Sequence, residues 1–418
     1  MTDRSGRMAE TVQVDLSRED GIPNYCAAGF LHGIKDSVPD EMIRPLKLRL
    51  ERTGKANTWQ QAERLKALGI EQQLIIEGWG WGEDKEHPGD NGRWDRWEAL
   101  VSNVVTETKA RGITVQWDLW NEPDYIYFWR RSPEQFDETW KRAYRVVRKL
   151  DPDAIIAGPG WSGEMDVYSA RFRQFLEFCK ENDVAPDYFC WHFPKDTVAE
   201  AKYIRDLLAE LQIEVKGLMV AEYCFEENMY CGRTVWEIAQ LERANIEYAC
   251  RASWWSPLGG ILADPKQGTP KGLWWAYKRY ADITGTLVHT EPSEHIDLVA
   301  GIDDKTETAL VLLGNKGSAA RASSGTFTDA AKGDLERGAD SSGTVTVRLT
   351  GLGKAPWLLK DGKLRVFVER LPGGDGAVES PPVVMESEMG TNGDSLDIMI
   401  PWDNERDAFA IQLGNVSR

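Results

Sequence analysis

Two glutamates, Glu122 and Glu222, each end a run of apolar residues. Positions 117–123 read Trp-Asp-Leu-Trp-Asn-Glu-Pro, and positions 217–222 read Gly-Leu-Met-Val-Ala-Glu. A charged side chain at the end of a buried run is costly when unpaired, so each glutamate needs a partner or a function. Two carboxyl groups that face each other across a cleft can act on a glycosidic bond as general acid and nucleophile, and a gap of about 5 Å would give retention of configuration.

The two glutamates would need different environments for that chemistry. Pro123 favours extended geometry in the preceding residue, so we expect Glu122 at the tip of a strand. Glu122 should be protonated, with its pKa raised by an apolar wall from Trp120 and the aromatic run 125–129. Glu222 should stay ionised, which requires hydrogen-bond donors; Tyr223, His192 or Arg49 could supply them.

Alternating short apolar runs and longer amphipathic runs indicate the fold that would hold these groups. Parallel strands covered on both faces have near-continuous apolar character. The repeat predicts a (β/α)8 TIM barrel over residues 21–285. The eight predicted strands are Tyr25–Phe30, Leu46–Leu50, Gln73–Glu77, Thr114–Trp120, Ala154–Ala157, Tyr188–Phe193, Gly217–Tyr223 and Arg251–Trp255.

Two capping boxes support helices between these strands. Ser132-Pro133-Glu134-Gln135 and Thr197-Val198-Ala199-Glu200 each place a hydroxyl residue three positions before Glu or Gln. A doubly wound fold would need a glycine-rich phosphate loop after the first strand, and Gly29-Phe30-Leu31-His32-Gly33 is not one. The barrel is therefore the favoured interpretation.

The composition changes after Gly285, where strand patterns alternate with Gly, Asp, Asn and Ser clusters. We predict a C-terminal β-sandwich over residues 286–418, with a loop at Ser318–Ser342. Residues 1–20 contain an alternating strand pattern, Met8–Leu16, that we expect to join the sandwich. The predicted sandwich strands are Ile296–Gly301, Glu307–Leu313, Thr344–Leu349, Lys363–Glu369, Ser395–Ile400 and Ala408–Leu413.

Chemistry in such a barrel lies at the C-terminal ends of the strands. Trp79 lies in a Gly-Trp-Gly-Trp-Gly loop, where an exposed ring would suit a sugar face. Trp254 and Trp255 are neighbours on a strand, so only one can line the mouth. The predicted strand-end residues are His32, Glu51, Glu77, Trp79, Asn121, Trp161, His192, Trp254 and Trp255, and the rival nucleophiles are Glu77, Glu164, Glu226 and Glu227.

Trp120-Asn121-Glu122-Pro123 resembles the acid/base motif of the clan A glycoside hydrolases. The whole barrel most resembles glycoside hydrolase family 39, which includes β-xylosidases and α-L-iduronidase. The resemblance implies a retaining glycosidase, with Glu122 as acid/base, Asn121 as donor to the sugar 2-hydroxyl and Glu222 as nucleophile. It also implies an oligosaccharide or glycoside as substrate.

Two positions depart from the family pattern. The family usually has threonine before the nucleophile and tryptophan after it, where this chain has Ala221 and Tyr223. These departures leave open a second interpretation, a carbohydrate-binding protein that kept the cleft and lost turnover. Phe193 also stands where a tyrosine is common. Tyr223, with His32 and His192, remains among the residues expected to contact the sugar.

Composition excludes several other classes of function. The net charge of -17 and pI near 4.9 disfavour nucleic-acid binding. No apolar run at the N-terminus predicts a signal peptide or membrane span, so we expect a cytoplasmic protein, or a secreted one if a leader was removed. The five histidines show no metal-binding spacing, and no cofactor motif appears. Cys224 and Cys231 flank a loop and could pair in an oxidising compartment.

Overall fold

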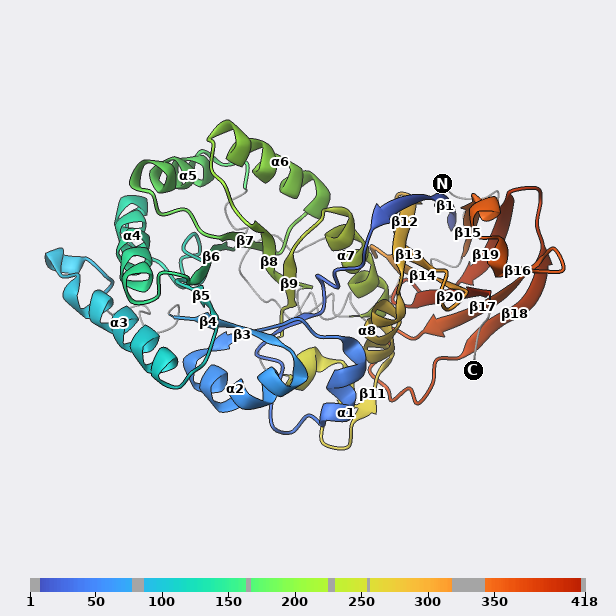
Figure 1. Cartoon of the computed structure of the whole chain (residues 1–418), viewed down its shortest axis with the longest axis horizontal. Helices are drawn as coiled ribbons and strands as arrows, with labels where there is room; N and C mark the ends of the chain where they lie inside the picture. The colour runs from blue at the N-terminus through green and yellow to red at the C-terminus, as the bar shows by residue number, and fades with distance from the viewer. Residues whose placement is uncertain are drawn as a thin grey trace, which may run out of the picture.

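The computed structural model describes residues 8–76, 86–162, 167–224, 230–253, 256–317 and 343–414. A ring of helices around a barrel lies beside a large sheet (Figure 1). The barrel closes through eight parallel strands in chain order, which confirms the predicted (β/α)8 fold. Its strands are β2 (Gly29–Leu31), β3 (Leu50–Gly54), β4 (Glu71–Ile75), β5 (Gln116–Asp118), β6 (Ile155–Trp161), β7 (Tyr188–His192), β8 (Gly217–Tyr223) and β9 (Tyr248–Arg251).

Eight α-helices surround the barrel strands or follow them in sequence. Ser132 caps α4 as predicted, since its side chain accepts the Gln135 N–H. The cap of α6 is Asp196, one residue before the predicted Thr197. The helices are α1 (Asp40–Ile43), α2 (Lys55–Leu68), α3 (Asp95–Ala110), α4 (Pro133–Leu150), α5 (Ala170–Asn182), α6 (Thr197–Glu210), α7 (Cys231–Arg243) and α8 (Gly272–Asp282).

Two barrel strands lie away from their predicted positions. Leu46, the predicted start of the second strand, ends a short 3-10 turn, and β3 begins at Leu50, where the prediction ended. The polar residues Glu51, Arg52 and Thr53 are typical of a loop, yet all three side chains are buried. The last strand, β9, ends at Arg251, where the prediction began. The shift of β3 places Arg52 inside the barrel wall.

The second unit is a ten-stranded, mostly antiparallel sheet that folds around one apolar core, as a sandwich does. The strand β1 (Met8–Gly21) pairs with β12 antiparallel and with β15 in parallel. The strands 286–291 and 383–390 were not predicted, and 318–342 lies outside the described residues. The other strands are β12 (Thr286–Glu291), β13 (Ile296–Asp303), β14 (Thr308–Asn315), β15 (Gly343–Thr350), β16 (Leu359–Lys360), β17 (Lys363–Leu371), β18 (Val383–Gly390), β19 (Ser395–Trp402) and β20 (Ala408–Gly414).

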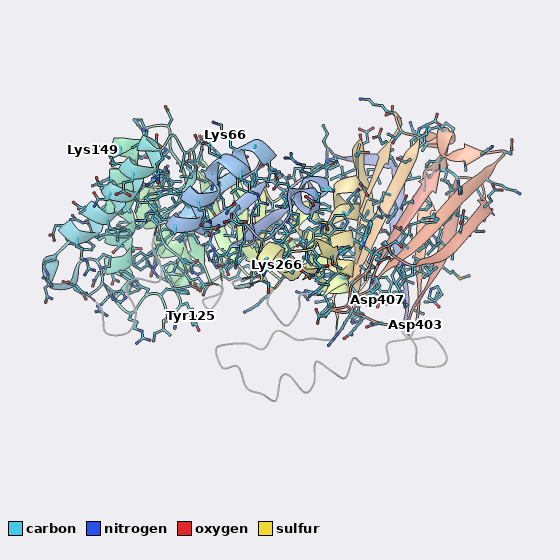
Figure 2. All side chains as sticks on the ribbon, turned by 90° about the horizontal axis from the view of Figure 1, so that it is seen from below. Lys66, Tyr125, Lys149, Lys266, Asp403 and Asp407 are labelled. Atoms are coloured by element: carbon cyan, nitrogen blue, oxygen red, sulfur yellow. The ribbon has the colours of Figure 1, made fainter. Side chains whose placement is uncertain are left out.

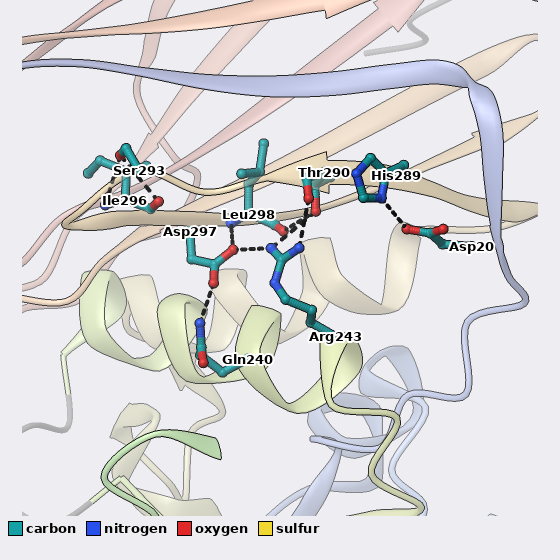
Figure 3. A network of polar contacts seen from close by, with 9 residues as sticks. All are labelled: Asp20, Gln240, Arg243, His289, Thr290, Ser293, Ile296, Asp297 and Leu298. Carbon is teal, nitrogen blue, oxygen red and sulfur yellow. Dashed lines mark hydrogen bonds and ion pairs between the residues drawn. The ribbon is translucent and has the colours of Figure 1, made fainter. Parts of the chain in front are cut away.

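Helix α7 joins the two units through close packing and a polar network. Figure 3 shows Arg243 of α7 between Asp297 and Thr290 of the sheet, with Gln240 donating to the same Asp297 carboxylate. A side chain on Gly314 would place its Cβ 2.2 Å from the Trp236 backbone nitrogen. The barrel and the sheet therefore meet backbone against backbone, with no room for a larger residue at that point.

All six cysteines are free thiols. The Cys224 sulfur lies 3.8 Å from the Thr234 hydroxyl, and the Cys231 thiol donates to the Pro372 carbonyl at 3.1 Å. The two cysteines therefore have separate partners and do not form a disulfide in this structure. Among the described residues, no helix is both long and apolar enough to cross a membrane.

Candidate active site

Glu122 lies just beyond the C-terminal end of β5 in a left-handed turn, with φ of 49°. Its N–H donates to the carbonyl of Gly160 on β6 at 3.0 Å, and its own carbonyl accepts the Tyr125 N–H at 3.1 Å. The expected extended geometry before Pro123 is therefore wrong at Glu122, because the bond to β6 holds the backbone in a conformation that is sparsely populated for residues other than glycine. Figure 2 places Tyr125 on the lower face of the molecule, opposite Lys66 and Lys149 near the C-terminal ends of their helices, so this turn lies at the C-terminal mouth of the barrel.

The two glutamates converge on His192, at the end of β7. His192 Nδ1 lies 2.9 Å from Glu122 Oε1 and 3.6 Å from Glu222 Oε1. One ligand atom from each of the three side chains lies within 4.8 Å of the others. The side chains are largely buried, with 8% of Glu122, 3% of Glu222 and none of His192 exposed. The upper limit of 4.8 Å on the distance between an oxygen of Glu122 and an oxygen of Glu222 is compatible with the carboxyl separation of about 5–5.5 Å found in retaining glycosidases, and shorter than that of inverting enzymes.

Arg52 is the donor that holds Glu222, and the sequence analysis did not identify it. Its Nη1 donates to Glu222 Oε1 at 2.8 Å, its Nη2 to Asn121 Oδ1 at 2.8 Å and its Nε to Asp118 Oδ2 at 2.8 Å. Arg49, which was expected to serve Glu222, instead donates to Glu247. Asn121 uses its oxygen on Arg52, so the group it can offer a substrate is its NH2.

Burial dominates the electrostatics of the site. It raises the pKa of Glu222 to about 7, although Arg52 favours the ionised form. Burial and the Arg52 charge hold the pKa of His192 well below its usual range, so the imidazole is neutral. Burial also raises the pKa of Asp118. With this pKa, Glu222 is mainly ionised only above about pH 7, whereas the sequence analysis expected it to be ionised throughout.

His32 lies at the end of β2 and is half-buried. Its Nδ1 is 2.7 Å from the Thr53 hydroxyl, and burial lowers its pKa to about 4, so the ring is neutral. A neutral imidazole at a strand end can exchange hydrogen bonds with a sugar hydroxyl. The substrate contact expected of His32 stays a prediction.

Two residues expected to contact substrate lie elsewhere. The Trp161 ring is 1% exposed and packs edge-on against Phe172 at 5.7 Å between ring centroids. The Tyr223 hydroxyl donates to the Ala27 carbonyl at 2.7 Å and lies 2.5 Å from the Tyr277 hydroxyl, in the layer between strands and helices. Both expectations are wrong because these side chains point into the core rather than toward the carboxyl groups.

Several expected site residues lie outside the described part of the chain. They are Trp79, Trp254 and Trp255 among the substrate contacts, and Glu77, Glu164, Glu226 and Glu227 among the rival nucleophiles. Glu51, also expected at a strand end, is fully buried and accepts the Ile34 N–H at 3.1 Å.

Glu122, His192 and Glu222 carry atoms that could bind a metal ion. However, the Arg52 guanidinium is bonded to Glu222 Oε1, and a fixed positive charge at that position disfavours a second cation. The arrangement instead suits proton transfer and nucleophilic attack by carboxyl groups, with a neutral histidine as hydrogen-bond partner.

Comparison with known proteins points in the same direction. Residues 85–219 match the model of the family described as Glycosyl hydrolases family 39. A 3-O-alpha-D-galactosyl-alpha-L-arabinofuranosidase of Bifidobacterium longum subsp. longum is 25% identical over 335 residues, covering 70% of this chain and 27% of that protein. A beta-xylosidase of Geobacillus stearothermophilus is 26% identical over 161 residues, covering 38% of this chain and 31% of that protein. The aligned regions thus span less than a third of either relative.

Solved structures share the whole architecture. The structure of N2152 from Neocallimastix frontalis has a TM-score of 0.78 at 22% identity and covers 98% of this chain and 100% of that one. A monomeric beta-xylosidase from Caulobacter crescentus CB15 has a TM-score of 0.66 at 15% identity, with the same coverage.

The barrel and the placement of Glu122 and Glu222 at its mouth resemble those of the clan A glycoside hydrolases. Within that class it is similar to family 39.

Proposed function

We propose that the protein hydrolyses a glycosidic bond with retention of configuration. The observation that supports this most directly is the convergence of Glu122 and Glu222 on His192, with one oxygen of each carboxyl within 4.8 Å of the other. That distance leaves room for an anomeric carbon and none for an intervening water, which favours double displacement over direct attack by water.

In the proposed first step, Glu222 attacks the anomeric carbon while Glu122 gives its proton to the leaving oxygen. The Glu222–sugar bond forms as the glycosidic bond breaks. His192, neutral at physiological pH, shares a hydrogen bond of 2.9 Å between its Nδ1 and Glu122 Oε1, and we assign the transferred proton to the other carboxyl oxygen of Glu122. In the second step, Glu122 takes a proton from water, and that water releases the sugar from Glu222.

Arg52 acts on the nucleophile throughout this cycle. Its bond to Glu222 Oε1 favours the carboxylate and leaves Oε2 as the attacking atom. The same guanidinium fixes Asn121, so the amide NH2 can donate to the sugar hydroxyl next to the reacting carbon. Such donors contribute most when they are held in place before the charge develops.

For the substrate, we propose a pentoside. Two of the matching relatives are named as an arabinofuranosidase and a beta-xylosidase, and arabinose and xylose are five-carbon sugars, whereas another is named as an alpha-galactosidase. Aryl α-L-arabinofuranosides and β-D-xylosides are therefore the first compounds to test, with aryl galactosides as the six-carbon comparison.

The alternative, a binding protein without turnover, depended on Ala221 and Tyr223. Ala221 lies in the apolar interior of the barrel and Tyr223 bonds to Tyr277, so neither departure from the family pattern touches the reacting carboxyl groups. The structural position of these two residues thus favours hydrolysis over the silent alternative.

The test is release of phenol from the aryl glycosides by wild type and by two variants. Glu122→Gln should lose about 10²–10⁴-fold in kcat/KM on a poor leaving group and much less in kcat/KM on dinitrophenol, which needs little protonation in the first step. Glu51→Gln is the matched control, because this buried glutamate accepts the Ile34 N–H and takes no part in the proposed steps, so the variant should keep turnover. Binding of sugar without any phenol release by wild type would favour the silent alternative.

A 2-fluoro glycoside trap tests the assignment of the nucleophile. The 2-fluoro group slows the second step, so the glycosyl enzyme accumulates and the labelled residue can be read by peptide mass spectrometry. We expect the label on Glu222. A label on Glu226 or Glu227 would overturn this assignment while leaving the reaction type intact.

A further inference from the structure

Asp118 lies beneath the two glutamates, on the last residue of β5, with none of its side chain exposed. It touches no cleft and takes no part in the proposed steps. A buried carboxylate is costly unless a cation and hydrogen bonds compensate it. The cation is Arg52, whose Nε donates to Asp118 Oδ2 at 2.8 Å, and whose nearest Nη atom to that oxygen is also 2.8 Å away.

The guanidinium of Arg52 is held by three residues through three different nitrogens. Glu222 and Asn121, the two residues at the mouth, take the Nη atoms, and Asp118, below them, takes Nε. A planar guanidinium fixed at one edge by a carboxylate cannot turn without losing the bonds at its other edge. The Asp118 bond therefore determines where the Nη donors point.

Charge adds a second effect. One cation, Arg52, serves two carboxyl groups, and burial raises the pKa of both Asp118 and Glu222. The negative charge of Asp118 also acts on Glu222 directly and further raises its pKa. A carboxylate that a cation holds too strongly is a weaker base and a weaker nucleophile.

We propose that Asp118 is a positioning residue for the reaction at Glu222: it locks Arg52 in the orientation that serves Glu222 and Asn121, and it takes up part of the Arg52 charge so that Glu222 remains a reactive nucleophile. The expected change in kcat rests on the proposed function. The expected change in the pKa of Glu222 rests only on the contacts of Asp118 and Arg52.

Few other groups near this cluster change charge in the working pH range. Burial keeps the thiols of β7 and β9 protonated by raising their pKa, and it keeps the β7 imidazole neutral. A shift in titration on removing Asp118 would thus report on the carboxyl groups at the mouth. The charged or titratable groups near Asp118, Arg52 or Glu222 include Glu122, Cys190, His192, Cys250 and also His32, whose pKa burial and the Arg52 charge lower to about 4.

The test is Asp118→Asn, which keeps the shape of the side chain and removes its charge. Arg52 then acts on Glu222 without competition, so the pKa of Glu222 should fall by about one unit. The acid limb of kcat/KM, which requires an ionised nucleophile, should move to lower pH by the same amount. We also expect kcat to fall by about tenfold, with a smaller change in KM, because the loss affects the chemical step.

Asp137→Asn is the matched control. Asp137 is also largely buried and makes two bonds to an arginine, Arg171, at 2.6 and 3.1 Å, but it lies on α4 outside the barrel. This variant should keep the wild-type pH profile. Melting temperatures of both variants establish that they are folded, and Asp118→Ala provides a second removal of the charge that should move the limb in the same direction.

Carbon-13 NMR of glutamate-labelled protein measures the Glu222 titration without any substrate, with Glu222→Gln to assign the signal. A Glu222 pKa that falls in Asp118→Asn supports the proposal even if no glycoside is turned over. A folded Asp118→Asn whose Glu222 titration and acid limb both match wild type would overturn it. A lower kcat with no shift in either titration would also overturn it, because it would reduce Asp118 to a packing role.

Discussion

The interior of the barrel and the core of the sheet are both buried, but the barrel contains charged side chains and the sheet core contains apolar ones. At its mouth and just below it, the barrel buries Arg52, Asp118 and Glu222 with at most 3% of any residue exposed. The sheet core, in the part of the chain described, is an apolar cluster that includes Val347, Ile398 and Ile411. Buried charges seldom stabilise a fold relative to apolar packing, whereas apolar burial does. The comparison indicates that the barrel interior serves chemistry and that the sheet contributes stability.

The contact between the two regions lies close to the nucleophile. Helix α7 is the next described element after β8, whose end carries Glu222, and the N–H of Gly232 in its first turn donates to the Arg406 carbonyl of the sheet unit at 2.8 Å. The Arg233 guanidinium also donates to the Lys316 carbonyl at the end of β14. The sheet thus holds helix α7, which follows the strand β8 that carries Glu222.

The largest effect is expected from Arg52→Met. This change leaves two buried carboxyl groups without their cation, which should lower the free energy of unfolding by about 3–5 kcal/mol. Loss of a fixed donor to Glu222 should also lower kcat by about 10²–10³-fold. Urea unfolding and aryl-glycoside kinetics measure the two effects. A variant as stable as wild type would mean that the barrel charges do not depend on Arg52.

Ile398→Ala tests the other side of the comparison. Truncation of this fully buried side chain in β19 should lower the free energy of unfolding by about 2–4 kcal/mol through lost burial and a residual cavity. Because the residue is far from the mouth in the fold, kcat per folded molecule should be unchanged. A change in kcat with unchanged stability would contradict the division between the two regions.

Glu222→Gln should increase stability in a pH-dependent way. The pKa of Glu222 is raised to about 7 in the folded state from about 4.5, so the protonated form is the favoured one and the wild type loses stability as pH rises from about 4.5 to 7. The variant avoids this loss. Its advantage should be absent near pH 4 and reach on the order of 2–3 kcal/mol above pH 7, measured by urea unfolding at several pH values.

Asp397→Asn should change the free energy of unfolding with the opposite dependence on pH. Its exposed bond to Arg348 lowers the pKa of Asp397, so its small contribution is present above the unfolded pKa and is lost as pH falls. This variant should be slightly less stable than wild type at neutral pH and equal to it in acid. Equal pH trends in the two variants would contradict the assigned charge states.

Gly314→Ala tests the contact between the two regions. The added methyl group would lie 2.5 Å from the Gly232 carbonyl oxygen, so one backbone must shift, at a cost of about 1–3 kcal/mol. Thermal unfolding measures the loss. Since Gly232 begins the helix after Glu222, we also expect a modest fall in kcat; Gly390→Ala, where added atoms meet nothing within 4 Å, is the control.

Much of the architecture could be predicted because it follows from period and apolar runs. The barrel, its chain order and seven strands of the sheet could be predicted from the spacing of apolar residues along the sequence. The strand β3 could not be placed, because Glu51 and Arg52 interrupt the apolar pattern that marks buried strands, and the Asp118 partner of Arg52 lies on another strand, β5. Arg52 was missed for that reason.

The direction in which side chains point at strand ends also could not be predicted from the sequence. A strand presents alternate residues to opposite faces, so one irregular position changes every assignment after it. The register of β8 shifts between Val220 and Tyr223, and that of β6 shifts near Pro159. These irregularities send Tyr223 and Trp161 outward, while Glu222 and His192 are left facing the mouth. Only coordinates could show this.

The position of β1 in the sheet has a consequence for biosynthesis. This strand, made first, lies between β12 and β15, which are separated from it by the entire barrel. During translation, β1 has no partner strand until β12 and β15, which begin at Thr286 and Gly343, have been synthesised. A fragment that starts after Gly21 would lack a central strand of the sheet, so we expect neither unit to be separable by simple truncation.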